Sequence, residues 1–267
     1  MSLSINTNSA ASFIKNQVTQ TNRLSSTTNQ QLTSGSRINS AADDAAGLAI
    51  STAMISQIRG MEQAVRNTND GISMLQVADG ALSVGSDIVQ RMRELTIQSA
   101  NGTLNDKDRT AIDKEYGQLL DQLDSIQQSS TFNGEKLFGE VGKAASLQVG
   151  ENAGDQIGLN LQSFDIKALK ESVVTPQERL AALDSTQENI NSIRGDIGAV
   201  TNRLESSARS LGKSIENTVG ANSRIADTDY AAAISERAAQ QIKEQVQIAL
   251  LGQANAQPNQ VMRLLGQ

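Results

Sequence analysis

The sequence predicts a mainly α-helical protein: a long antiparallel helical bundle or coiled coil with one small β-hairpin region and with termini that pair as a coiled coil. Three observations support this fold class. Aromatic residues make up only 2% of the 267 residues, so the core must be built from smaller apolar side chains along narrow seams. Apolar and small residues recur at alternating spacings of three and four over long stretches. The only two prolines, Pro176 and Pro258, leave room for long uninterrupted helices.

The first long helix is predicted from Asn39 to Ala100. Ser40, followed by Asp43 three residues later, resembles a capping box and would start this helix. At ~1.5 Å per residue the helix would be about 90 Å long, which is too long for the interior of a globule, so it needs partner helices along its length. Its predicted seam consists of Met61, Ala64, Thr68, Gly71, Leu75, Ala78, Leu82, Gly85, Val89 and Met92.

A shorter helix is predicted to begin after Asn105. Asp106 and Asp108 follow it and place negative charge at the positive end of the helix dipole. The apolar seam of this helix consists of Ile112, Tyr116, Leu119, Leu123 and Ile126.

Another long helix is predicted to begin at Thr175, which would cap it. Pro176 then occupies the first helical position and Glu178 the third, a pattern typical of helix starts. Its seam consists of Ile190, Ile193, Ile197, Val200, Leu204, Ser207 and Leu211. The last step of this seam is four residues long, and the next apolar step, to Ile215, is four residues as well. Two successive steps of four are a stutter, which locally unwinds a left-handed supercoil.

One β-hairpin is predicted between these helices, in a region of about 134–170. Within SLQVGENAGDQIGLNLQSF (146–164), apolar residues alternate with polar ones around a Gly- and Asn-rich centre. The alternating residues are Leu147, Val149, Ile157, Leu159 and Leu161. Asn133-Gly134, just before this region, is interpreted as a turn.

The two ends of the chain differ from the middle, because they are poor in charge and rich in Ser, Thr, Asn, Gln and Ala. Residues 1–42 contain no acidic residue, and beyond Glu244 the only charge is Arg263. Apolar stripes are still present at Ile14, Val18, Thr21, Ser25, Thr28 and Leu32 and at Ile234, Ala238, Ile242, Val246 and Ala249. Helices this weakly apolar do not offset their own ordering entropy. We therefore expect the ends to be disordered in a monomer and to fold by pairing with each other and with neighbouring subunits.

These patterns predict two domains. Residues 1–42 together with 228–267 are expected to form a terminal coiled-coil domain, and residues 43–227 a helical bundle that carries the hairpin.

The composition excludes several classes of function. The chain has no His and no Cys, which removes His-dependent triads, thiolate nucleophiles and the common zinc sites, so no catalytic residue, cofactor or metal site is predicted. Asp43 and Asp44 are adjacent, and their side chains diverge by roughly 100° on a helix, so capping is a better explanation than acid–base chemistry.

Neither nucleic acid nor a membrane is an expected partner. The net charge is −6 and no block of Lys and Arg occurs, which disfavours phosphate binding. No apolar run approaches the ~20 residues that a membrane helix needs. The start of the sequence does not resemble a cleavable signal peptide, so export would require another machine.

Several motifs resemble those of bacterial flagellins. QLTSGSRINSAADDAAGLAIS (31–51) is similar to the family's N-terminal signature, and RNTNDGISMLQVADGAL, QRMRELTIQSANGTL and FNGEKLF follow in the family's order. SRIADTDYAAAISERAAQQI and ALLGQANAQPNQVMRLLG are similar to the C-terminal signature. The resemblance covers nearly the whole chain. The outer variable domains of larger flagellins are missing, because the chain runs from the hairpin through Lys170 almost directly to Thr175.

The resemblance implies a structural subunit, not an enzyme, that polymerises into the extracellular flagellar filament for motility. It also implies export in an unfolded state by the flagellar type III apparatus. The implied partners are other copies of the chain, an export chaperone, the filament cap and hook-junction proteins. The terminal coiled-coil residues expected to serve assembly are Ile14, Val18, Leu32, Ile234, Ile242, Val246 and Leu250.

In relatives that infect animals, the resemblance further implies that a Toll-like receptor reads a patch on the bundle, which also serves subunit packing. Met92 stands where valine is common in the family's motif. The matching patch consists of Gln90, Arg91, Arg93, Glu94, Leu95, Gln98 and Glu115.

Three other functions are compatible with parts of the sequence. A hook–filament junction protein of the same superfamily would be an adaptor present in few copies. A chemoreceptor-like signalling coiled coil would have similar Ala- and Gln-rich helices, but it would lack the β segment at 146–164. An enzyme would need a Ser-Lys or carboxylate site, for which no constellation is present.

Overall fold

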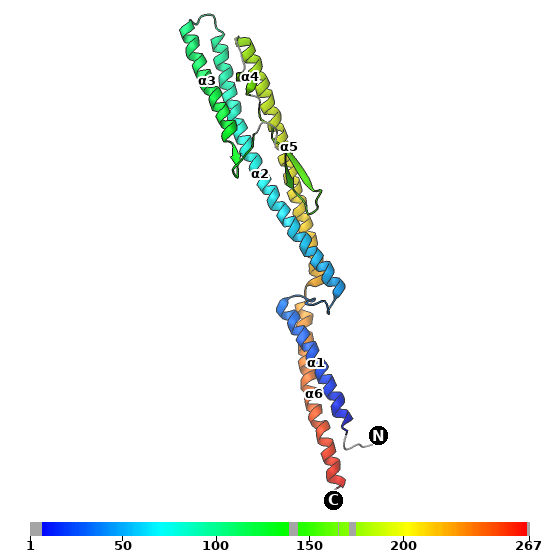
Figure 1. The fold of residues 1–267 in the computed structure, drawn as a ribbon. Helices are drawn as coiled ribbons and strands as arrows, with labels where there is room; N and C mark the ends of the chain where they lie inside the picture. Colours follow the sequence, from blue (N-terminus) through cyan, green and yellow to red (C-terminus); the bar gives the residue numbers. More distant parts are fainter. Residues whose placement is uncertain (1–6, 139–143, 165, 171–174, 266–267) are drawn as a thin grey trace. The chain divides into compact units, whose positions relative to one another are not determined.

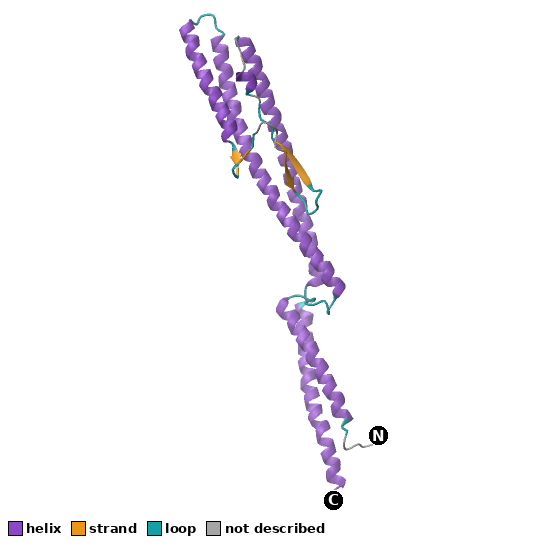
Figure 2. Ribbon diagram, viewed as in Figure 1, coloured by secondary structure: helices purple, strands orange, loops and turns teal. Residues whose placement is uncertain are grey.

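The computed structural model describes residues 7–138, 144–164, 166–170 and 175–265, and it confirms a mainly α-helical fold (Figures 1 and 2). The elements are, in chain order, α1 Ser9–Ser34, α2 Ala45–Ser99, α3 Asp106–Ser129, β1 Thr131–Phe132, β2 Glu135–Lys136, β3 Ala144–Gln148, β4 Gln156–Asn160, α4 Lys167–Lys170, α5 Pro176–Ala226 and α6 Tyr230–Leu265. They form two compact units. The terminal unit is Met1–Ser56 with Asn217–Gln267, and the bundle unit is Gln57–Glu216.

The bundle unit is held together by the long seam of α2, which faces α3, α5 and the segment between them (Figure 1). All ten residues of the predicted α2 seam are buried, from Met61 to Met92. The seams predicted for α3 and α5 supply the facing side chains, of which Leu123, Ile190 and Leu204 are fully buried. Because these seams alternate apolar and small residues, the helices pack closely without large aromatic side chains.

The predicted hairpin is present as β3 and β4, which pair antiparallel with Leu147 opposite Ile157. Gly71 of α2 explains how the hairpin reaches the helix, since a Cβ at this position would overlap the Leu147 side chain. Asn67 of α2 also donates a hydrogen bond of 3.2 Å to the Gln148 carbonyl. The hairpin is therefore held on α2 by side-chain packing at Gly71 and by the hydrogen bond from Asn67.

Two of the four phenylalanines close the core near the end of the hairpin segment. Phe138 and Phe164 meet edge to face, with ring centroids 5.8 Å apart. Phe164 is 1% exposed. Together with Phe132 of β1, they place three of the chain's six aromatic residues where strands and loops pack on the helices.

The turn at Asn133-Gly134 carries a second small β-pair that the sequence analysis did not predict. Asn133 and Gly134 both have positive φ, 51° and 80°, as a tight two-residue hairpin turn requires. Strands β1 and β2 are only two residues long, which is too short for an alternation of apolar and polar side chains to be detected. The helix α4 was missed because four residues are too few to show a helical spacing of apolar side chains.

Two predicted helix starts are confirmed. Asn105 accepts from the Asp108 amide while the Asp108 side chain accepts from the Asn105 amide, which completes a capping box. Thr175 and Glu178 make the same reciprocal exchange before α5.

The predicted start of the first long helix is wrong. Asp43 does bond to Ser40, but this contact closes a turn, and α2 begins only at Ala45. The cap is instead Asp44, whose carboxylate accepts from the Gly47 amide at 2.8 Å.

Replacing Leu82 by alanine should destabilise the bundle unit by about 2–5 kcal/mol, because it leaves a cavity at a fully buried position of the α2 seam. Urea unfolding followed by circular dichroism measures the change. Val84→Ala on the same helix is the matched control, since Val84 is 48% exposed and should change stability by only about 0.5 kcal/mol. Equal losses for the two variants would contradict the assigned seam.

Candidate functional site

The first candidate surface is the terminal unit, in which α1 and α6 lie side by side and run antiparallel (Figure 1). The face of α1 turned toward α6 follows the predicted stripe, with spacings of three and four. Its residues, here called the α1 seam, are Ala11, Ile14, Val18, Thr21, Ser25, Thr28 and Leu32, all buried or half-buried. The centre of this seam is polar, because Thr21, Ser25 and Thr28 follow one another there.

The face that α6 turns toward α1 is not its apolar stripe. The buried and half-buried residues, here called the α6 seam, are Ala233, Gln240, Glu244, Gln247, Leu251 and Ala254. The predicted stripe is exposed instead: Ile234 is 57% exposed, Ile242 63%, Val246 52% and Leu250 47%. With Ala238 and Ala249, these four residues form what is here called the α6 apolar stripe. The stripe therefore contributes little to the α1–α6 pair, because at its centre a hydroxyl of the α1 seam meets an amide side chain of α6 instead.

The α6 seam was missed although the sequence carried a signal for it. Ala233, Gln240, Gln247 and Ala254 lie seven residues apart, which is the repeat of a coiled-coil position. The signal is weak because two of the four side chains are amides. A search for apolar residues alone therefore selects the stronger stripe on the other side of the helix.

Hydrogen bonds near both ends fix how α1 and α6 are aligned. Just after the end of α1 and just before the start of α6, the Arg37 amide donates to the Ala226 carbonyl at 2.6 Å and the Thr228 amide donates to the Gly35 carbonyl at 3.0 Å. At the other end, the Asn8 side chain donates to the Ala254 carbonyl at 2.9 Å. The short pairing of residues 35–37 with 225–228, here called the clasp, joins the two terminal segments through their backbones.

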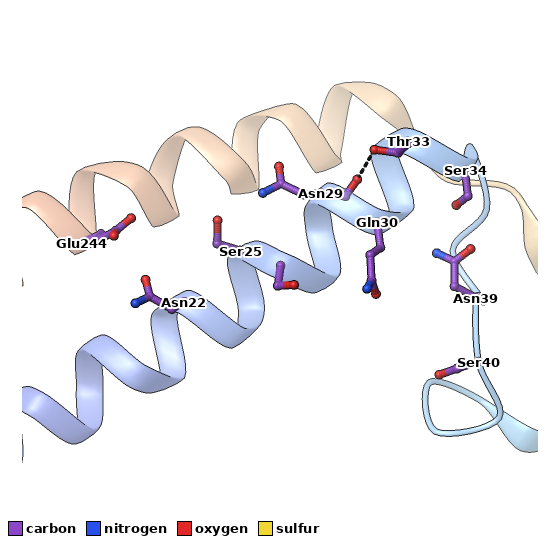
Figure 3. Close-up of a pocket in the computed structure, with 10 residues that line it drawn as sticks. Asn22, Ser25, Asn29, Gln30, Thr33, Ser34, Asn39, Ser40 and Glu244 are labelled. Atoms are coloured by element: carbon purple, nitrogen blue, oxygen red, sulfur yellow. Dashed lines mark hydrogen bonds between the residues drawn. The ribbon is translucent and has the colours of Figure 1, made fainter.

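A polar groove lies beside the α1 seam (Figure 3). Its volume is about 960 Å³, and it is lined by Asn22, Ser25, Ser26, Asn29, Gln30, Thr33, Ser34, Asn39, Ser40 and Glu244. Glu244 is the one ionisable side chain among these, so the groove has no acid–base pair. Across the described part of the chain, no group of three carboxylates gathers that could hold a metal ion.

The second candidate surface is the predicted patch on the bundle unit. Arg91 of α2 forms ion pairs of 3.0 Å with Glu94 and with Glu115 of α3. Both glutamates raise the pKa of the Arg91 guanidinium, and Glu115 has the larger effect. Arg93 points to a different partner, Asp184 of α5, at 3.3 Å.

The structure brings most, but not all, of the predicted patch to the surface. Gln90 and Gln98 are exposed together with Arg91, Glu94 and Glu115. Leu95 is 2% exposed and lies in the core of the bundle, where it supports the patch from beneath.

Two flagellin family models match most of the chain. The bacterial flagellin N-terminal helical region matches residues 5–143, and the bacterial flagellin C-terminal helical region matches residues 180–265. The chain belongs to the flagellin family. Flagellin from Halalkalibacterium halodurans is 41% identical over 244 residues, which cover 88% of this chain and 90% of that relative.

Solved structures support the same assignment. The crystal structure of Bacillus cereus flagellin matches with a TM-score of 0.51 and 33% identity, over 55% of this chain and 88% of that one. A putative flagellar hook-associated protein from Vibrio parahaemolyticus matches with a TM-score of 0.60, over 69% of this chain and 100% of that one. At 18% identity the second match shows a shared fold alone.

Membership of this family establishes the broad function. The chain is a structural subunit of the extracellular flagellar filament and not an enzyme. Among the described residues, no helix combines the length and the apolar character needed to cross a membrane.

Replacing Arg91 by alanine removes both ion pairs of the patch. The Tm of the bundle should fall slightly, and a further Glu115→Ala change should add less than it does alone, because its partner is already missing. Thermal unfolding of the two single variants and the double variant measures this non-additivity. Strict additivity would show that Arg91 and Glu115 do not interact in solution.

Proposed function

We propose that the α6 apolar stripe is the surface through which a flagellin subunit contacts neighbouring copies in the filament. The observation that carries this proposal is that four large apolar side chains of one helix stay about half exposed or more, although the helix already has a partner. A row of exposed apolar residues on a helix is typical of an interface with another molecule. A second copy of the chain is the partner that a homopolymer supplies.

The proposal divides the predicted assembly residues into two groups. Ile14, Val18 and Leu32 belong to the α1 seam and act within the chain. Ile234, Ile242, Val246 and Leu250 belong to the exposed stripe and act between chains.

We also propose export in an unfolded state through the flagellar type III apparatus, with an export chaperone, the filament cap and hook-junction proteins as partners. The α1 and α6 seams support this, since they consist largely of Ala, Ser, Thr and Gln. Such seams bury little apolar area, so folding of the isolated terminal unit gains little free energy, and keeping this unit unfolded before assembly requires little work.

A filament subunit differs from a hook–filament junction adaptor in what the purified chain does, because only the filament subunit polymerises indefinitely. Long filaments seen by negative-stain microscopy support flagellin, and persistent monomers under the same conditions would contradict it.

The double change Ile242→Ser and Val246→Ser should weaken polymerisation, because it removes apolar area from the stripe without touching the α6 seam. Sedimentation after seeding with wild-type fragments measures the critical concentration, which should rise at least tenfold. Ile242→Leu with Val246→Ile is the matched control, since it keeps the stripe apolar, and it should polymerise as the wild type does. A serine variant with the wild-type critical concentration would refute the assignment.

We further propose that a host Toll-like receptor reads the patch around Arg91 and Glu115 on the free subunit. The patch is exposed, it carries both charge signs, and the buried Leu95 holds it in place. Arg91→Ala should lower the response of receptor-expressing reporter cells to purified monomer. Arg66→Ala, an exposed arginine elsewhere on α2, should leave the response unchanged. Silence of the wild-type monomer at saturating dose would reject the proposal.

A further inference from the structure

The α6 helix has two faces of very different character, and the less apolar one packs on α1. At about 100° per residue, the α6 apolar stripe lies roughly half a turn around the helix from the α6 seam. The hydrophobic effect alone favours burying the stripe against Ile14, Val18 and Leu32. Something in the chain must therefore select the polar face.

The selecting contact is visible at the centre of the pair. Thr28 and Gln240 are each 4% exposed, and the Gln240 amide donates a hydrogen bond of 3.3 Å to the Thr28 hydroxyl. That hydroxyl in turn donates to the Leu24 carbonyl at 3.0 Å. If α6 turned its stripe inward, the buried Thr28 hydroxyl would face Ile and Val side chains and lose its acceptor role.

A second layer of the same kind lies one heptad away. Thr21 is seven residues before Thr28 and is 6% exposed. Gln247 is seven residues after Gln240, and both Thr21 and Gln247 line one small cavity between the helices. In an antiparallel pair, equal steps in opposite directions bring Thr21 level with Gln247.

The two glutamines make the α6 seam less apolar than a coiled-coil position usually is. Both line the small cavity beside α1, and neither side-chain carbonyl oxygen accepts a hydrogen bond from a described residue. A seam selected for stability alone would carry apolar side chains at these positions. Buried polar residues at coiled-coil positions are the known means of choosing one pairing over others.

We infer that the Thr28–Gln240 and Thr21–Gln247 layers select which face of α6 packs on α1, and that they thereby keep the apolar stripe free for other subunits. The clasp limits sliding along the helix axis, and the two layers limit rotation about it. This inference rests on the proposed role of the stripe in filament contacts.

The test uses Thr21→Val with Thr28→Val, which removes the two hydroxyls while keeping the shape of the side chains. Thr19→Val with Thr33→Val is the matched control, because these exposed threonines of α1 also donate to the carbonyl four residues back. The chain has no cysteine, so introduced pairs report the orientation of α6 directly. Ser25→Cys is combined either with Glu244→Cys, on the α6 seam, or with Ile242→Cys, on the stripe.

The ratio of the 25–244 to the 25–242 disulfide is measured in the full-length free subunit under mild oxidation, which traps the α1–α6 pair each time it forms. The 25–244 disulfide should dominate in the wild-type and control backgrounds, and the ratio should reverse in the Thr21→Val, Thr28→Val background. An unchanged ratio would overturn the inference. Filament formation, assayed separately without the cysteines, should be impaired by the same change. A reversed ratio with normal filaments would instead contradict the proposed role of the stripe and leave the face selection established.

Discussion

The pairing of α1 with α6 decides what the terminal unit offers to other molecules. Each face of α6 can be used once, so the face that packs on α1 is lost to other partners. In this structure the packed face is made of Ala, Gln and Glu with one Leu, and the face with Ile234, Ile242 and Val246 stays exposed. The proposed contact between neighbouring filament subunits follows from that choice.

In the bundle unit, by contrast, the large apolar side chains of the helices are buried within the unit. Its seams bury Leu, Ile, Val and Met almost completely, with Leu75, Leu82 and Leu204 at 1% exposure or less. A unit built in this way is stable by itself, because the apolar area removed from water is large. The two units therefore differ in role: the bundle provides a folded body, and the terminal pair provides the surface that we propose neighbouring subunits cover.

The fold was predictable wherever side-chain chemistry and helix geometry agree. The α2 seam was found residue by residue, because a spacing of three and four with apolar or small side chains has one structural solution. The cap at Asn105 was found for a similar reason. The pairing face of α6 was not, because it depends on the hydroxyls of Thr21 and Thr28 on a helix more than 200 residues away in sequence. The start of α2 was misplaced since Ser40 and Asp43 can close either a helix cap or a turn.

We expect the terminal helices to gain their stability from neighbouring subunits that cover the exposed face of α6. Amide hydrogen exchange of residues 230–257, compared between the free subunit and the assembled filament, tests it most directly. We expect weak protection in the free subunit and strong protection in the filament, with the largest gain around Ile242 and Val246. Strong protection of both terminal helices in the free subunit, unchanged by assembly, would contradict it.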